Sequence, residues 1–91
     1  MSNPHIRMYC TGFCPYCIRA NQLLQSKGVD FEKIDAGSAK VWSQMEAESK
    51  RNTVPQIFVG DLHLGGYDDI AALERDGKLD GILSGEVTSL E

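Results

Sequence analysis

The chain has 91 residues, of which 42% are hydrophobic and 24% are charged, and its formal net charge at pH 7 is −4. These values are ordinary for one small globular domain over residues 1–91 and exclude a fibrous or disordered class. The sequence has neither a basic run that could follow a phosphate backbone nor an apolar run of signal-peptide or membrane-span length, so we expect no nucleic-acid partner, no membrane partner and a cytoplasmic location.

The first part of the chain predicts a strand, a helix and a second strand. Apolar and polar residues alternate over positions 5–9, which is typical of a strand, and a second strand is expected over 29–34. Between them a helix is expected from Pro15 to about Lys27, ended by Gly28. Its apolar face is expected to comprise Ile18, Ala20, Leu23 and Leu24. This order predicts two parallel strands joined by a right-handed crossover.

The middle of the chain predicts a second helix and a β-hairpin. Ser38 is a candidate N-cap for a helix that ends near residue 49. The buried stripe of this helix is expected to be Val41, Trp42 and Met45. Strands are expected over 56–59 and 62–64, and the two residues between them, Gly60-Asp61, suit a hairpin turn.

The last part of the chain predicts a third helix over 70–76, capped by Asp68 or Asp69, and one more turn over 79–83. Residues 84–91 have little to bury and are expected to form a loose tail. Taken together, the elements predict an α/β fold, a four-stranded mixed β-sheet flanked by helices on both faces.

The chemistry is expected at Cys14-Pro15-Tyr16-Cys17. Two thiols separated by two residues can form a disulfide only where the backbone bends sharply, and Pro15 suits the first turn of a helix because its missing N–H has no helical partner to lose. Cys14 would then face the unpaired N–H groups at the helix N-terminus, which stabilise a thiolate, whereas Cys17 lies further in and stays protonated longer. We therefore predict Cys14 as the nucleophile and Cys17 as the resolving thiol.

Two alternatives concern the cysteines. A Cys-x-x-Cys pair can be half of a zinc site, but structural zinc needs four ligands, and Cys10, His5 and His63 are not spaced as a second close pair. We therefore expect redox chemistry and no metal. Cys10 is expected to pack as a small hydrophobic residue at a strand end, and the alternative is a disulfide with Cys14 under oxidation.

Several motifs taken together resemble a known family. Tyr9, the dithiol, Thr53-Val54-Pro55-Gln56 and Gly65-Gly66-Tyr67-Asp68-Asp69 occur in the order typical of a glutaredoxin of the dithiol class, over residues 5 to about 83. The resemblance implies a thioredoxin fold and an enzyme that reduces protein disulfides and glutathione mixed disulfides, with glutathione as the reducing co-substrate. It also implies a cis bond before Pro55, whereas the residues alone would only place Pro55 at the start of a strand.

The resemblance further implies a glutathione groove beside Cys14. Tyr16 would form one wall of this groove. Thr53 and Val54, next to Pro55, would pair through their backbone with the cysteinyl part of glutathione, as an added strand does.

The γ-glutamyl end of glutathione would be held by Gly66, Tyr67, Asp68 and Asp69, because N–H groups that open a helix suit its carboxylate and an aspartate suits its ammonium group. Arg51 would reach the glycine carboxylate. A simpler reading remains for each charged residue: one aspartate as a cap or first-turn charge, and Arg51 as a surface charge.

The sequence departs from the family pattern at Thr11, where many dithiol glutaredoxins carry a lysine that favours the thiolate. Without that lysine, we expect the helix N-terminus and local N–H donors to supply most of the thiolate stabilisation, and carboxylate binding to depend more heavily on Arg51. We expect a monomer whose partners are glutathione and proteins that carry a disulfide or a bound glutathione. The alternatives are a thioredoxin-reductase-coupled redoxin, against which Tyr16 and the Gly-Gly-Tyr-Asp-Asp segment argue, and an iron–sulfur cluster carrier, against which Pro15 and Tyr16 argue.

Overall fold

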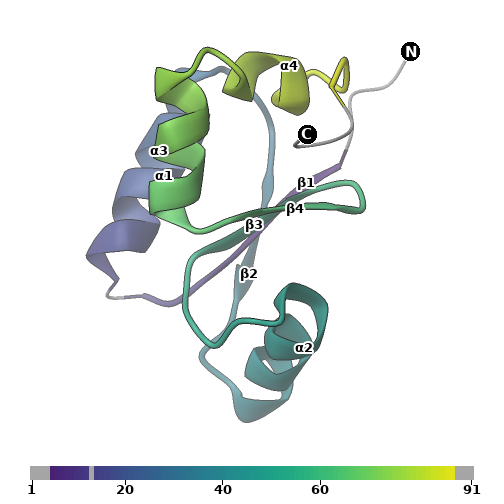
Figure 1. Ribbon diagram of the computed structural model, residues 1–91. Helices are drawn as coiled ribbons and strands as arrows, with labels where there is room; N and C mark the ends of the chain where they lie inside the picture. The colour runs from purple at the N-terminus through teal and green to yellow at the C-terminus, as the bar shows by residue number, and fades with distance from the viewer. Residues whose placement is uncertain (1–4, 13, 88–91) are drawn as a thin grey trace.

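The computed structural model of the protein describes residues 5–12 and 14–87 (Figure 1). Within these ranges no helix is long and apolar enough to cross a membrane. The helices and strands are, in chain order, β1 (Ile6–Cys10), α1 (Pro15–Ser26), β2 (Glu32–Asp35), α2 (Ala39–Ser49), β3 (Gln56–Val59), β4 (Leu62–Gly65), α3 (Tyr67–Arg75) and α4 (Leu79–Leu83).

The strands of the described chain form a 4-stranded sheet in the order β2-β1-β3-β4. β1 pairs parallel with β2, and α1 is the crossover between them. β3 pairs antiparallel with both β1 and β4. The sheet is therefore mixed, and with helices packed on both of its faces it confirms the predicted fold class.

The sheet separates two layers of helices. α1, α3 and α4 cover one face, where Met8 of β1 packs with Leu24 of α1 and Ile70 of α3. Figure 1 shows α1 and α3 side by side on this face. α2 covers the other face, where Tyr9 packs with Met45. Met8, Leu24, Met45 and Ile70 are each 0% exposed, and burying such a side chain stabilises the fold by about 1.5–3 kcal/mol relative to leaving it in water.

Polar contacts add to the packing of α2 against the sheet. The Tyr9 hydroxyl donates a hydrogen bond to the Glu48 carboxylate, which also accepts one from Arg7 at 3.1 Å. These two hydrogen bonds lower the pKa of Glu48, so its carboxylate keeps its charge to a lower pH than an ordinary glutamate. α2 is thereby fixed, and with it the start of the segment that leads from its C-terminus to Pro55.

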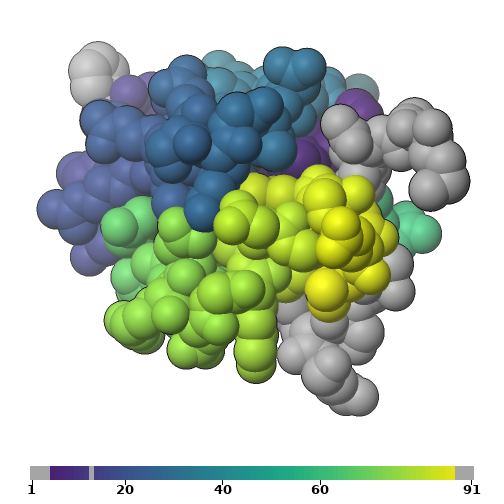
Figure 2. Space-filling view, turned by 90° about the horizontal axis from the view of Figure 1, so that it is seen from above, coloured from purple at the N-terminus to yellow at the C-terminus, as the bar shows by residue number. Residues whose placement is uncertain are grey.

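The C-terminal residues pack on α1 and α3. Figure 2 shows α3 in green beside α4 in yellow, and Lys27 at the end of α1 forms ion pairs with Glu74 and Asp80. After α4, the Val87 N–H donates to the Gly81 carbonyl at 3.0 Å, so the chain follows this surface as far as residue 87. Residues 88–91 of the predicted loose tail lie outside the described residues.

Two predicted elements differ in detail from the structure. The predicted apolar face of α1 is wrong at Ile18, which is 53% exposed; the buried residues of this helix are Cys17, Ala20 and Leu24. The second strand begins at Glu32 instead of Val29, although Val29 and Phe31 still pack against the core. β2 is an edge strand, so its extent is set by its pairing with β1 rather than by its apolar residues.

Candidate active site

Cys14 opens α1, as predicted. It is the N-cap residue, with an extended backbone at φ −116° and ψ 113°, and Pro15 follows it at the start of the helix. The Ile18 N–H donates to the Cys14 carbonyl at 3.0 Å and closes the first turn. Cys14 therefore stands at the N-terminus of the helix, where the first N–H groups have no intrahelical partner.

Cys17 is shielded in the way the sequence predicts. Its side chain is 4% exposed and belongs to the core on the α1 face of the sheet. Burial, supported by the neighbouring Cys14 thiol and opposed by a backbone hydrogen bond from Thr11, raises the pKa of the Cys17 thiol to about 12. At neutral pH Cys17 is therefore a protonated thiol, and Cys14 is the more exposed of the pair.

Cys10 ends β1 and lies in the same core. Burial raises the pKa of its thiol, which is the behaviour expected of a packed cysteine. Cys10, Cys14 and Cys17 are all free in this structure, so the fold keeps Cys10 as a packed thiol beside the dithiol.

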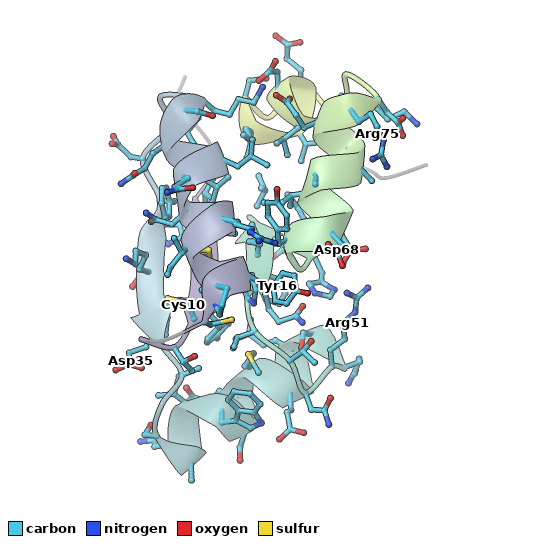
Figure 3. All side chains as sticks on the ribbon, turned by 90° about the vertical axis from the view of Figure 1, so that its left-hand side faces the viewer. Cys10, Tyr16, Asp35, Arg51, Asp68 and Arg75 are labelled. Carbon is cyan, nitrogen blue, oxygen red and sulfur yellow. The ribbon has the colours of Figure 1, made fainter. Side chains whose placement is uncertain are left out.

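A groove of about 340 Å³ lies beside the start of α1. It is formed by three separate segments: the first turn of α1, the loop between α2 and β3, and the start of α3. Its lining residues are Tyr16, Arg51, Thr53, Val54, Pro55, Gly66, Tyr67, Asp68 and Asp69. These are the residues that the family resemblance selects for glutathione, and the fold brings all of them to one place. Figure 3 shows Tyr16, Arg51 and Asp68 around this region.

Cys14 adjoins the groove through Val54. The Cys14 Sγ lies 3.8 Å from the Val54 carbonyl oxygen, which is within the distance of a weak S–H···O hydrogen bond. The Val54–Pro55 peptide bond is cis, which confirms the expectation from the family resemblance. The Cys14 sulfur and the Val54 carbonyl at the cis peptide bond are therefore next to each other.

An ion pair spans one end of the groove. Arg51 Nη1 lies 2.8 Å from Asp69 Oδ2, and the same oxygen accepts the Gly66 N–H at 2.9 Å. Burial by itself would raise the pKa of Asp69, but the hydrogen bonds from Arg51 and Gly66 outweigh it and lower the pKa. Both side chains are more than 40% exposed, with values of 47% and 43%, so the ion pair is weak enough for a charged ligand to replace.

The start of α3 differs from the prediction. The helix begins at Tyr67 with Gly66 as its N-cap, three residues before the expected start at Ile70. Asp69 is therefore in the first turn, and its carboxylate reaches back to the Gly66 N–H. Gly65 makes room for that carboxylate: its φ is +107°, and a Cβ placed there would lie 2.3 Å from Asp69 Oδ2.

A second hollow of about 310 Å³ lies on the other side of the dithiol. It is lined by Met8, Cys10, Thr11, Gly12, Cys17, Ile18, Asn21, Lys33 and Asp35. In Figure 3, Cys10 and Asp35 lie on the opposite side of the first turn of α1 from Arg51 and Asp68. The buried Asn21 Oδ1 has no hydrogen-bond partner among the described residues. Residues 5–12 and 14–87 contain no group of three or more His, Cys, Asp or Glu side chains that could hold a metal ion.

One polar arrangement near the groove is absent from the sequence prediction. Gln56 is 0% exposed and hydrogen-bonds both to Thr53 and to His63 on the neighbouring strand. The motif Thr53-Val54-Pro55-Gln56 includes Gln56, but the sequence gives no sign of its partner, because that depends on the pairing of β3 with β4.

The comparisons with known proteins agree on one family. Residues 6–64 match the family model described as Glutaredoxin. A glutaredoxin of Pseudomonas aeruginosa is 51% identical over 82 residues, which cover 89% of this chain and 98% of that protein. The solution structure of a glutaredoxin from Brucella melitensis has a TM-score of 0.85 at 43% identity and covers 98% of both chains.

A second solved structure, the crystal structure of a buckwheat glutaredoxin–glutathione complex, has a TM-score of 0.81 at 28% identity and covers 91% of this chain and 78% of that one. These matches agree with the site itself, in which a dithiol opens a helix beside a cis proline. The chain therefore belongs to the glutaredoxin family of thiol–disulfide oxidoreductases.

Proposed function

We propose that this protein reduces glutathione mixed disulfides and protein disulfides through Cys14 and Cys17, with glutathione as the reducing co-substrate. The observation that carries the proposal is the position of Cys14, whose Sγ lies 3.8 Å from the Val54 carbonyl at the edge of the groove. The buckwheat relative, solved as a complex with glutathione, supports the same assignment.

The groove offers a partner for each polar part of glutathione. The backbone of Thr53 and Val54 would pair with the cysteinyl part and hold its sulfur toward Cys14. Arg51 would bind the glycine carboxylate by exchanging its hydrogen bond with Asp69. Tyr16 is 51% exposed, so its ring is accessible as a wall of the groove.

The γ-glutamyl end would lie at the start of α3. The first N–H groups of this helix, after Gly66 and Tyr67, suit a carboxylate because they lack intrahelical partners. Asp68 and Asp69 place negative charge beside them, which suits the ammonium group of the same amino acid.

The chemistry follows thiol–disulfide exchange. The Cys14 thiolate attacks the glutathione sulfur of a glutathionylated substrate, the substrate S–S bond breaks, and the substrate leaves as a thiolate. Cys14 now holds glutathione in a mixed disulfide. Attack by the thiolate of a second glutathione breaks this bond, returns the Cys14 thiolate and releases glutathione disulfide. Cys17 takes no part in this route.

Protein disulfides require both thiols. Cys14 attacks and forms a mixed disulfide with the protein, and Cys17 then attacks Cys14 after losing its proton, so that the protein leaves reduced. Its high pKa makes Cys17 a poor nucleophile until a base accepts that proton. Two glutathione molecules then reduce the Cys14–Cys17 disulfide. We place this cycle in a reducing cytoplasm and in a monomer.

The test is glutathione-dependent reduction of a glutathionylated peptide, coupled to glutathione reductase, with wild type, Cys14→Ser and Cys17→Ser. We expect Cys14→Ser to lose turnover and Cys17→Ser to keep it. Loss of turnover in Cys17→Ser would contradict the division of roles. A wild type that works only with thioredoxin reductase would point to the redoxin alternative, and a coloured protein after anaerobic purification would point to the cluster carrier.

A further inference from the structure

A line of hydrogen-bonded side chains leads from the groove to β4. Thr53 lines the groove, whereas Gln56 and His63 are not among its lining residues. Gln56 Nε2 lies 3.0 Å from the Thr53 carbonyl oxygen and 3.1 Å from Thr53 Oγ1. His63 Nε2 lies 2.7 Å from Gln56 Oε1. One buried amide therefore connects a histidine on β4 to both polar groups of a groove residue.

Only one arrangement of hydrogens satisfies these contacts. The Thr53 carbonyl can only accept, so Gln56 must turn its NH₂ group toward Thr53 and its oxygen toward His63. The amide oxygen can also only accept, so His63 Nε2 must carry a hydrogen. Because Thr53 Oγ1 accepts a hydrogen bond from Gln56, this contact does not use the hydroxyl hydrogen of Thr53, which can therefore donate to a ligand.

The surroundings hold this arrangement in place. Gln56 is 0% exposed, so its amide has no access to water as an alternative partner. The His63 ring packs on the Phe58 ring with centroids 4.8 Å apart, and the two residues face each other in the register of β3 and β4. Burial lowers the pKa of His63, and nearby Arg51 adds to this while Asp69 opposes it. The imidazole is therefore neutral at neutral pH.

We propose that His63 and Gln56 are positioning residues that act in series to orient the carbonyl and the hydroxyl of Thr53 for a peptide-like ligand in the groove. The proposal rests on the proposed function, because Thr53 is one of the two residues whose backbone would pair with the cysteinyl part of glutathione. Neither residue lines the groove, so the proposal gives neither of them a direct contact with the ligand. Their removal therefore weakens binding and leaves the exchange chemistry unchanged.

Two variants of His63 separate its hydrogen bond from its packing. His63→Phe keeps an aromatic ring against Phe58 and removes the N–H donor. His63→Gln keeps an N–H donor of similar reach and removes the ring. With a glutathionylated peptide as substrate, we expect His63→Phe to raise KM about fivefold and keep kcat within about twofold, and His63→Gln to keep KM within about twofold of wild type.

Two outcomes would overturn the proposal: a wild-type KM in His63→Phe, or a larger KM in His63→Gln than in His63→Phe. Failure of the proposed function would look different, because the wild type itself would show no glutathione-dependent turnover. An NMR measurement of the His63 ring nitrogens in the free wild-type protein tests the arrangement in that case too. We expect the hydrogen on Nε2. A neutral ring with its hydrogen on Nδ1 would contradict the proposed hydrogen bond from His63 to Gln56.

Discussion

The two hollows beside the dithiol have similar volumes, about 340 Å³ for the groove next to Cys14 and about 310 Å³ for the second hollow next to Cys17. Each is also lined by one basic residue and at least one acidic residue. They differ in what their polar groups can do. The groove combines an exchangeable ion pair, a backbone edge at the cis peptide and the start of a helix.

The second hollow has two thiols in its wall, Cys10 and Cys17, but both are buried and burial raises the pKa of each. A larger hollow of about 470 Å³, lined by His5 and Leu83 among others, has no cysteine in its wall. Neither size nor the presence of a thiol in the wall therefore singles out the proposed active site. What distinguishes the groove is an accessible thiol beside free backbone and charged groups. Four predictions test this difference between the groove and the second hollow.

The largest expected difference is in thiol reactivity. With a pKa of about 12 for Cys17, about one molecule in ten thousand carries the Cys17 thiolate at pH 8, and this fraction rises about tenfold with each pH unit. We expect iodoacetamide at pH 8 to label Cys14 at least about a hundred times faster than Cys17 or Cys10, as measured by mass spectrometry. In urea the three rates should become similar. Similar labelling rates for the three cysteines in the folded protein would contradict the distinction between the groove and the second hollow.

The next prediction compares one glycine from each side. Gly65→Ala places a Cβ 2.3 Å from Asp69 Oδ2 at a φ of +107°, and it should lower the free energy of unfolding by about 2 kcal/mol or more. For Gly12→Ala in the second hollow, no atom of the described residues other than those of its chain neighbours lies within 4 Å of the new Cβ, so it should change the free energy by less than about 1 kcal/mol. Urea unfolding measures both, and equal effects would show that the Gly65 backbone is not constrained.

A third comparison uses one cation from each side. Arg51→Ala should raise KM for a glutathionylated peptide about fivefold, which corresponds to about 1 kcal/mol for an exposed ionic contact. Lys33→Ala removes an equal charge from the second hollow and should leave KM within about twofold of wild type. Equal increases in the two variants would mean that Arg51 acts only through long-range attraction.

The smallest effect is expected at Asn21 in the second hollow. Its Oδ1 is buried and has no partner among the described residues, so Asn21→Leu removes no protein hydrogen bond from that oxygen. We expect the free energy of unfolding to change by less than about 0.5 kcal/mol and KM to stay unchanged. A loss of several kcal/mol in urea unfolding would contradict this expectation and show that the Asn21 side chain makes a stabilising contact.

The groove could be predicted from the sequence only through the family resemblance. Its residues occur in short motifs, and the order of these motifs is typical of glutaredoxins, so the family's groove residues could be transferred to this chain one by one. The line from His63 to Thr53 could not be predicted in this way. It depends on which residue of β4 faces β3, and an irregularity in the pairing between Ile57 and Phe58 shifts that register.

The same limit explains the errors in the elements. Ile18 is apolar, but the face of α1 that meets the sheet is set by the stripe of Cys17, Ala20 and Leu24. An apolar residue next to that stripe is left exposed beside the dithiol. The third helix begins early because Gly66 can act as its cap while Asp69 satisfies the Gly66 N–H from inside the helix.

The assembly of the groove from residues 16, 51–55 and 66–69 has a consequence for biosynthesis. At a synthesis rate of about 5–20 residues per second, the ribosome completes the dithiol seconds before it completes the start of α3. During that interval the emerging chain carries both thiols without the surface that would select among disulfides. We therefore expect any selectivity that the groove provides to arise only after the start of α3 has been made, whereas both thiols of the dithiol are present in the chain from residue 17 onward.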